Sequence, residues 1–353
     1  MKNNKLAYIL GVILLTVCGG ILIAGQTKNF NAQKNSNVGK HPKTDAGEYR
    51  LSGPYTHKNL SIFLVHSKTT TRTKTFLTLQ EALEQKKVVV YETQSVNELA
   101  IQNLSNEDVY VQSGDIVKGG QQDRMIGVDL IVPPKSGKMP ISAFCVEHGR
   151  WSGRGNERAG VFNSSSDAVA TREIKLAAKS SRSQGAVWEN VRLAQDKLSQ
   201  NVGTRVNSTV SESSLQLALE NTKLRETAES YVKALGNIAG GSDVTGYVFA
   251  INGKVNSADV YSSNALFRKL WPKLLKANAV EAIAELQKHK FEPASKDAVK
   301  TFLRDAEQAR RSEKEVSKRV KLVTREDDKN VLFETRDESE KGAWVHRNYI
   351  KKN

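Results

Sequence analysis

The chain has 353 residues, 39% of them hydrophobic and 26% charged, which is enough for one large or two ordinary domains with a buried core. Its formal net charge of +15 favours an anionic partner: phosphate, nucleic acid, an acidic glycan or a lipid surface. Charge spread over many solvated faces would instead serve solubility alone. The two cysteines, Cys18 and Cys145, exclude a disulfide framework and a cysteine-based zinc site.

The N-terminal segment, residues 1–25, predicts a transmembrane signal anchor. Lys2 and Lys5 precede an apolar run, LAYILGVILLTVCGGILIAG, that reaches Gly25 without a charge. About 20 apolar residues are needed to cross a bilayer as a helix. A cleaved signal ranks second, because the run is long and ends in a weak cleavage site. A lipoprotein signal ranks third, because Val17 precedes Cys18 where a small residue is required.

The short basic flank predicts a single-pass protein with its amino end in the cytoplasm. The main domain would then be extracytoplasmic, either periplasmic or at the cell surface, and the helix would contact membrane lipid. Residues 26–47 are rich in Asn, Lys, Gly and Ser, which is typical of a flexible linker. Nucleic-acid binding is not expected of a domain exported across a membrane.

The first part of the main domain has the pattern of antiparallel strands. Short runs rich in Val, Ile and Tyr alternate with polar breaks, and a short helix is expected at 77–85. The expected strands cover residues 49–56, 60–66, 88–92, 98–104, 109–117, 125–132 and 140–147.

The second part has helical periodicity. A Gly/Ser-rich loop over 152–166 precedes expected helices at 172–201, 211–235 and 263–287, the last containing Pro272. Asn252-Gly253 predicts a hairpin turn within 244–260, since both positions must tolerate a positive φ. The fold class is therefore α+β, with an antiparallel β-rich half followed by a helical half that contains a hairpin.

The main domain is predicted to span residues 48–292. Residues 293–353 are expected to form a charged helix over 295–318 and a small β extension, with strand-like pieces at 321–335 and 343–350.

The densest block of unusual residues is 113–151, SGDIVKGGQQDRMIGVDLIVPPKSGKMPISAFCVEHGRW. Two glycines inside a strand pattern indicate a bulge or a close approach of the backbone to a ligand. A nearby guanidinium could grip a phosphate, a carboxylate or an amide-bearing ring, with the glycine amides as further donors. The predicted binding residues are Gly119, Gly120, Gln122, Arg124, Glu147, Arg150 and Trp151.

Three alternatives remain for this block. The same residues can form a buried Arg–Glu network with Trp151 in the core, because such networks also fix strand geometry. A hydrolase would use Glu147 or Asp123 as general acid or base near Arg124. A scaffold, finally, would use the block only for packing.

No other motif points to catalysis or to a cofactor. Strand alternation places Cys145 and His148 on opposite faces, so Cys145 is expected to be a small buried residue rather than a nucleophile. The six histidines show no metal-ligand spacing, and no phosphate-binding glycine loop or nucleophile elbow is present. We therefore expect no metal and no cofactor.

The pieces GGQQDR, DLIVPP and FCVEHGRW resemble the ARPP-1 family, the ARG and rhodanese-phosphatase-superfamily-associated protein domain. VWENV (187–191), GYVFAINGKV (246–255) and LFRKLWPKLL (266–275) fit the same resemblance, which covers about residues 50–290. The family is uncharacterised. Its name records an association with ADP-ribosylglycohydrolases and rhodanese-like phosphatases, which implies an ADP-ribose, NAD-derived or phosphorylated ligand. The matching positions are Gly120, Gln122, Arg124, Cys145, Glu147, Arg150 and Trp151.

Overall fold

The computed structural model describes residues 49–67, 75–168 and 171–352, all within one structural unit, 43–353. The anchor predicted at 1–25 and the linker predicted at 26–47 lie outside the described residues. Within the described ranges, no helix combines the length and apolar character needed to span a membrane.

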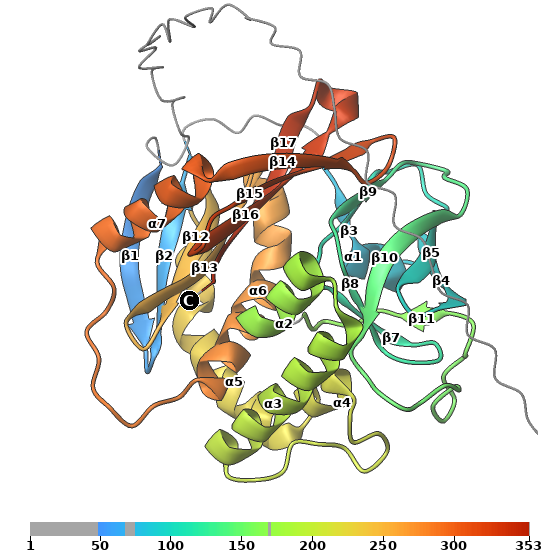
Figure 1. Ribbon diagram of the computed structural model, residues 1–353, viewed down its shortest axis with the longest axis horizontal. Helices are drawn as coiled ribbons and strands as arrows, with labels where there is room; N and C mark the ends of the chain where they lie inside the picture. The colour runs from blue at the N-terminus through green and yellow to red at the C-terminus, as the bar shows by residue number, and fades with distance from the viewer. Residues whose placement is uncertain (1–48, 68–74, 169–170, 353) are drawn as a thin grey trace, which may run out of the picture. The chain divides into compact units, whose positions relative to one another are not determined.

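The main layer is an eight-stranded antiparallel sheet, in the order β1-β2-β12-β13-β17-β16-β15-β14 (Figure 1). One half combines β1 and β2 with the β12–β13 hairpin, the other comes from residues 310–351, and the two meet where β13 pairs with β17. The strands are β1 (Arg50–His57), β2 (Leu60–His66), β12 (Val244–Ile251), β13 (Lys254–Tyr261), β14 (Arg310–Glu315), β15 (Val320–Glu326), β16 (Asn330–Asp337) and β17 (Ala343–Lys351).

Residues 77–163 build a second β region beside this sheet. It contains a six-stranded sheet, β11-β7-β8-β10-β5-β4, and a three-stranded sheet, β3-β6-β9, in which only β3 and β6 are parallel among the described pairs. The strands are β3 (Leu77–Thr78), β4 (Val88–Ser95), β5 (Glu98–Asn103), β6 (Val109–Val111), β7 (Ile116–Gly119), β8 (Arg124–Ile126), β9 (Leu130–Val132), β10 (Met139–Cys145) and β11 (Phe162–Asn163).

The helices cover both faces of the large sheet. Alternate residues of β12 show this: Tyr247 and Phe249 join the core beneath α6, whereas Val248 joins the core beneath α7. A strand buried on both faces needs apolar residues throughout, which explains the run in VTGYVFAI. The helices are α1 (Leu79–Glu84), α2 (Arg172–Leu176), α3 (Gln184–Val202), α4 (Leu215–Leu219), α5 (Thr222–Leu235), α6 (Asn264–Ala284) and α7 (Lys296–Gln308).

The α+β class, with an antiparallel β-rich first half and helices later, is confirmed. The hairpin is also confirmed, since Asn252 and Gly253 both have positive φ between β12 and β13. Predicted single elements are divided in several places. The strand expected at 109–117 becomes β6 and β7, separated by Gly114 with its φ of +94°. The strand expected at 125–132 becomes β8 and β9, which belong to different sheets.

The helix predictions need similar corrections. The segment 211–235 holds α4 and α5, because the Asn221 side chain accepts a hydrogen bond from the Leu224 amide and starts a new helix. The segment 172–201 holds α2, a π-helical turn (Ala177–Ser181) and α3, with Arg182 left-handed between them. The helix expected to reach residue 318 ends at Gln308, and β14 follows. The strands of 293–353 are hydrogen-bonded into the large sheet.

We expect Gly253→Ala to destabilise the protein by about 1–3 kcal/mol, because any side chain is strained at this positive φ and an added Cβ would overlap the Glu292 carbonyl oxygen. Gly185, in α3, has open space around it, so Gly185→Ala should raise stability by up to about 1 kcal/mol. Urea unfolding measures both changes. Equal midpoints for the two variants would contradict the role given to the hairpin turn.

Candidate functional site

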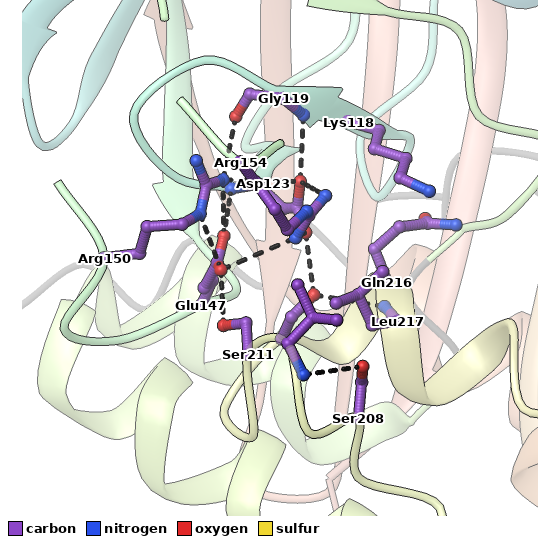
Figure 2. Close-up of polar contacts among 12 residues, drawn as sticks. Lys118, Gly119, Asp123, Glu147, Arg150, Arg154, Ser208, Ser211, Gln216 and Leu217 are labelled. Carbon is purple, nitrogen blue, oxygen red and sulfur yellow. Dashed lines mark hydrogen bonds and ion pairs between the residues drawn. The ribbon is translucent and has the colours of Figure 1, made fainter. Parts of the chain in front are cut away.

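Four residues from the predicted block and its following loop form what we name the Asp123–Glu147 network: Asp123, Glu147, Arg150 and Arg154 (Figure 2). Asp123 immediately precedes β8, and Glu147 follows the end of β10. Arg150 grips Glu147 with two hydrogen bonds, Nε to Oε1 at 2.8 Å and Nη2 to Oε2 at 2.7 Å. Arg154 grips Asp123 in the same way, at 2.9 and 3.0 Å. Both carboxylates are fully buried.

Neighbouring groups satisfy the remaining acceptor positions of both carboxylates. Asp123 accepts from the Gly119 amide at 2.9 Å and from Ser214 Oγ at 2.7 Å. Glu147 accepts from the Asp123 amide at 2.9 Å and from Ser211 Oγ at 2.5 Å. A buried charge is tolerated when it is paired and hydrogen-bonded in this way, so the network has the geometry of a stable structural unit.

The glycine pair serves the network through its carbonyl groups. Arg150 donates to the carbonyl oxygens of Gly119 at 3.1 Å and Gly120 at 3.0 Å. Gly120 has a φ of +55°, and a Cβ there would overlap the Phe162 ring, so the close approach is to that ring. The Gly120 amide donates to the Val161 carbonyl oxygen. The two glycine amides are thus already engaged within the protein.

Arg124 lies apart from Glu147. It is fully buried and contacts both Glu92 carboxylate oxygens at 3.2 Å, and it donates to the Val96 carbonyl oxygen at 2.6 Å. Neighbouring strand residues point to opposite faces, which separates Arg124 from Asp123. Trp151 is 48% exposed, with its ring 5.7 Å from the Arg124 guanidinium carbon.

The structure therefore brings together Gly119, Gly120, Glu147 and Arg150, and puts Arg124 with Trp151 elsewhere. Gln122 is buried, and its Oε1 has no hydrogen-bond partner among the described residues. Sequence reasoning missed several partners, because they lie in polar loops without periodicity or on distant strands. These are Arg154, Ser211 and Ser214 for the network and Glu92 for Arg124.

The ionisation of this region argues against acid catalysis by Glu147. Burial raises the pKa of Glu147, but hydrogen bonds from Arg150, Ser211 and the Asp123 amide outweigh it and hold the pKa below its usual value. A group held ionised cannot serve as a general acid. Burial raises the pKa of Cys145 to about 11, so the thiol stays protonated, as expected for a core residue.

A second region has the space that the Asp123–Glu147 network lacks. A cavity of about 290 Å³, here named the β10–β16 cavity, opens between β9 and β10 on one side and β14, β15 and β16 on the other. The π-helical turn before α3 forms a third wall. Its lining residues include Leu130, Ile141, Phe144, Leu322 and Phe333 as apolar groups and Asp129, Ser142, Lys179, Arg182, Lys314 and Thr335 as polar groups.

Behind one wall of this cavity, a histidine joins two carboxylates in what we name the His346 network: Asp129, His346 and Asp259. His346 Nδ1 lies 2.7 Å from Asp129 Oδ2, and Nε2 lies 3.0 Å from Asp259 Oδ1. All three side chains are buried, and the imidazole stacks on Tyr261 with ring centroids 4.5 Å apart. The pairing requires a doubly protonated ring, which donates to both carboxylates.

The pKa values follow from this geometry. Burial alone would lower the pKa of His346, but Asp129 and Asp259 raise it to about 9. Burial would raise the pKa of Asp129, but the His346 charge and hydrogen bond bring it well below the usual range. The network is thus an imidazolium held between two carboxylates at neutral pH.

Lys179 extends this network into the cavity. Its Nζ donates to Asn348 Oδ1 at 2.8 Å, and Asn348 in turn donates to Asp259 Oδ1 at 2.9 Å. Sequence reasoning missed this cluster because its members come from four distant segments and no spacing links them. Among the described residues, no cluster of three or more His, Cys, Asp or Glu side chains is arranged to hold a metal ion.

We expect Glu147→Gln to lower the free energy of unfolding by about 3–5 kcal/mol at neutral pH, because it leaves Arg150 without its buried partner charge. A carboxyl whose pKa is lower in the folded protein than in the unfolded chain stabilises the folded state at pH values above the unfolded pKa, here 4.5. This stabilisation is lost as the pH falls through the folded-state pKa. The cost of the substitution should therefore shrink below pH 4.5. Urea unfolding at several pH values measures this loss of stability. Glu189→Gln, which breaks an exposed ion pair with Arg192, is the control. Equal stability of both variants would contradict the network's role.

The His346 network predicts an opposite pH dependence. Because the pKa of His346 is higher in the folded protein than in the unfolded chain, the imidazolium stabilises the fold fully at pH values below the unfolded pKa of 6.5. This stabilisation is lost as the pH rises through the folded-state pKa of about 9. The free energy of unfolding should fall by about 3 kcal/mol across this window. His346→Gln should remove this slope, whereas His289→Gln, at an exposed position, should keep it. A wild-type slope that survives His346→Gln would show that another group titrates.

The ARPP-1 family model, described as the ARG and Rhodanese-Phosphatase-superfamily-associated Protein domain, matches residues 48–350. The match extends past residue 290, where the sequence resemblance was expected to end, and includes the C-terminal strands of the large sheet. No curated protein and no solved structure matches the chain. From the family match, which covers most of its length, the chain belongs to the ARPP-1 family.

Proposed function

We propose that this protein is a ligand-binding domain that holds a small anionic, ring-containing molecule in the β10–β16 cavity. The observation that carries the proposal is the composition of this cavity. Phe144 and Phe333 supply aromatic walls, Arg182 and Lys314 supply cationic side chains, and Lys179 supplies an amine on the inner wall. Ligand sites in proteins combine mostly apolar walls with a few polar groups that orient the ligand.

Two cationic side chains at the mouth of the cavity offer contacts to an anion. Arg182 and Lys314 are exposed there, while Lys179 donates from the inner wall. Three acidic residues, Glu98, Asp129 and Glu315, also line the cavity, and His346 and Thr335 hydrogen-bond the Asp129 carboxylate. A phosphate or carboxylate bound between Arg182 and Lys314 would gain charge-assisted hydrogen bonds.

The volume of the cavity limits the size of the enclosed group. At about 290 Å³ it is at the lower end of the range for ligand pockets, roughly 300–1,000 Å³. We infer that it encloses one ring with its anionic substituent, as in a phosphorylated sugar or the terminal part of ADP-ribose. The rest of a dinucleotide would extend into solvent.

The Asp123–Glu147 network supports the cavity from behind. β10 contributes Ser142 and Phe144 to the cavity wall, and Glu147 fixes the chain just beyond its end. A structural role for this network is favoured over the hydrolase alternative, because Glu147 and Asp123 are enclosed by Arg150 and Arg154. Their carboxylates have no open side toward a substrate.

We also propose that the domain is extracytoplasmic and anchored by the N-terminal segment in membrane lipid. The uncharged apolar run and its basic inner flank support this location.

The test is thermal unfolding of the purified chain with ADP-ribose, NAD, ribose 5-phosphate or uncharged ribose. An anionic ligand that binds, at a concentration about 100 times its Kd, should stabilise the native state by about 2.7 kcal/mol. Uncharged ribose should have no effect. Arg182→Ala should weaken binding about tenfold by removing a charge-assisted contact. Lys300→Ala, at an exposed position on α7, is the matched control. An Arg182→Ala affinity equal to that of the control would contradict the assigned site.

A further inference from the structure

Lys179 stands between two cavities. It lines the β10–β16 cavity and also a smaller one of about 20 Å³ beside Asp259 and Asn348. Its Nζ is held between Asn348 Oδ1, at 2.8 Å, and the Phe333 ring, whose centroid is 4.5 Å away. The amine is therefore fixed in position at the wall of a space that can contain a ligand.

Lys179 differs from other lysines of the interior in its partners. Lys118 pairs with Glu220 at 2.6 Å, Lys273 pairs with Asp115 at 2.5 Å, and Lys276 pairs with Asp167. Lys179 instead donates to an amide oxygen and has no carboxylate at ion-pair distance among the described residues. An amide oxygen accepts a hydrogen bond equally from a neutral amine, so this contact does not require a charge.

The surroundings make the neutral amine of Lys179 more accessible than that of an exposed lysine. Burial lowers the pKa of Lys179, and the carboxylates of Asp129 and Asp259 offset this only in part. His346 already pairs with both carboxylates. Their charge therefore favours the protonated form of Lys179 less strongly than unpaired carboxylates would. Neutral, desolvated lysines are the form that attacks carbonyl carbons.

The backbone at Lys179 is also specialised. The residue lies in the π-helical turn Ala177–Ser181, which ends at the left-handed Arg182. Such turns are rare in proteins overall, and those that occur often lie at functional sites, because the extra residue redirects the side chains. Here the turn places Lys179 and Arg182 on the same cavity wall.

We propose that Lys179 is a nucleophile that condenses with an aldehyde or ketone group of an anionic ligand in the β10–β16 cavity; this rests on the proposed function. The neutral Nζ attacks the carbonyl carbon, and the C=O electron pair moves to oxygen. That oxygen takes one amine proton. Water then leaves with the second amine proton as the C=N bond forms. No oxidant, reductant or added acid is needed. Arg182 and Lys314 hold the anionic group, so the carbonyl faces the inner wall.

The probe is pyridoxal 5′-phosphate, an anionic aromatic aldehyde, with pyridoxine 5′-phosphate as its alcohol counterpart. The purified chain is incubated with the aldehyde and reduced with borohydride, and labelled lysines are located by peptide mass spectrometry. We expect Lys179 to be labelled about tenfold faster than other lysines, and inorganic phosphate to slow this labelling. Lys179→Arg removes the primary amine but leaves Arg182 and Lys314 in place, so this variant should still bind the alcohol. Lys175→Arg, one turn earlier and outside the large cavity, should leave Lys179 labelling unchanged.

The outcomes separate the two proposals. Binding of the alcohol without preferential labelling of Lys179 would overturn the nucleophile and leave the binding function standing. Preferential labelling that phosphate does not slow would support the nucleophile and contradict the anion site. If the alcohol does not bind and labelling follows surface exposure alone, both proposals fail. Loss of alcohol binding in Lys179→Arg, with an unchanged unfolding temperature, would make Lys179 a binding contact rather than a nucleophile.

Discussion

The buried imidazolium of His346 is the interaction on which the rest of the structure depends. It lies between Asp259 on β13 and Asp129, which precedes β9, and so joins the large sheet to the second β region. Removing three ionised groups from water is costly, and their mutual attraction compensates only because each carboxylate also accepts further hydrogen bonds. Tyr110 and Thr335 donate to Asp129, and Tyr247 donates to Asp259. The β10–β16 cavity lies beside this junction, so its walls are fixed by the same contacts that unite the sheets.

The Asp123–Glu147 network and the β10–β16 cavity both involve β10 and the residues that follow it. At the far end of this strand, Glu147 and Asp123 are enclosed by Arg150 and Arg154 with every strong acceptor position engaged. Earlier in the strand, Phe144 contributes to a wall with empty space in front of it. A saturated cluster stabilises one geometry, whereas an open cavity leaves binding energy for a ligand. The region richest in unusual residues is thus best explained as support for the neighbouring cavity.

The fold class, the β-rich first half and the Asn252-Gly253 hairpin were predictable because each depends on local chemistry: alternation, or the φ that a turn requires. The contact of Arg150 with Glu147 was within reach for the same reason, since the two lie three residues apart. Arg124 was grouped with Glu147, whereas the structure pairs it with Glu92, because strand alternation cannot be followed past the end of β10 at Cys145 and does not place Glu147. The His346 network was beyond reach, because pairing across more than 200 residues leaves no periodic trace in the sequence. Strand breaks such as Gly114 were missed for a different reason, since a single residue divides two otherwise continuous apolar runs.

The position of β17 in the large sheet has a consequence for folding. This strand follows the other seven strands of the sheet in the sequence, yet it is inserted between β13 and β16 and carries His346 and Asn348. During synthesis it emerges after those seven strands, so the two halves of the sheet can join only once it is present. Long-range pairing of this kind slows folding and leaves strand edges unpaired in the meantime. The joining of the two halves of the sheet and the assembly of the His346 network therefore both depend on the insertion of β17.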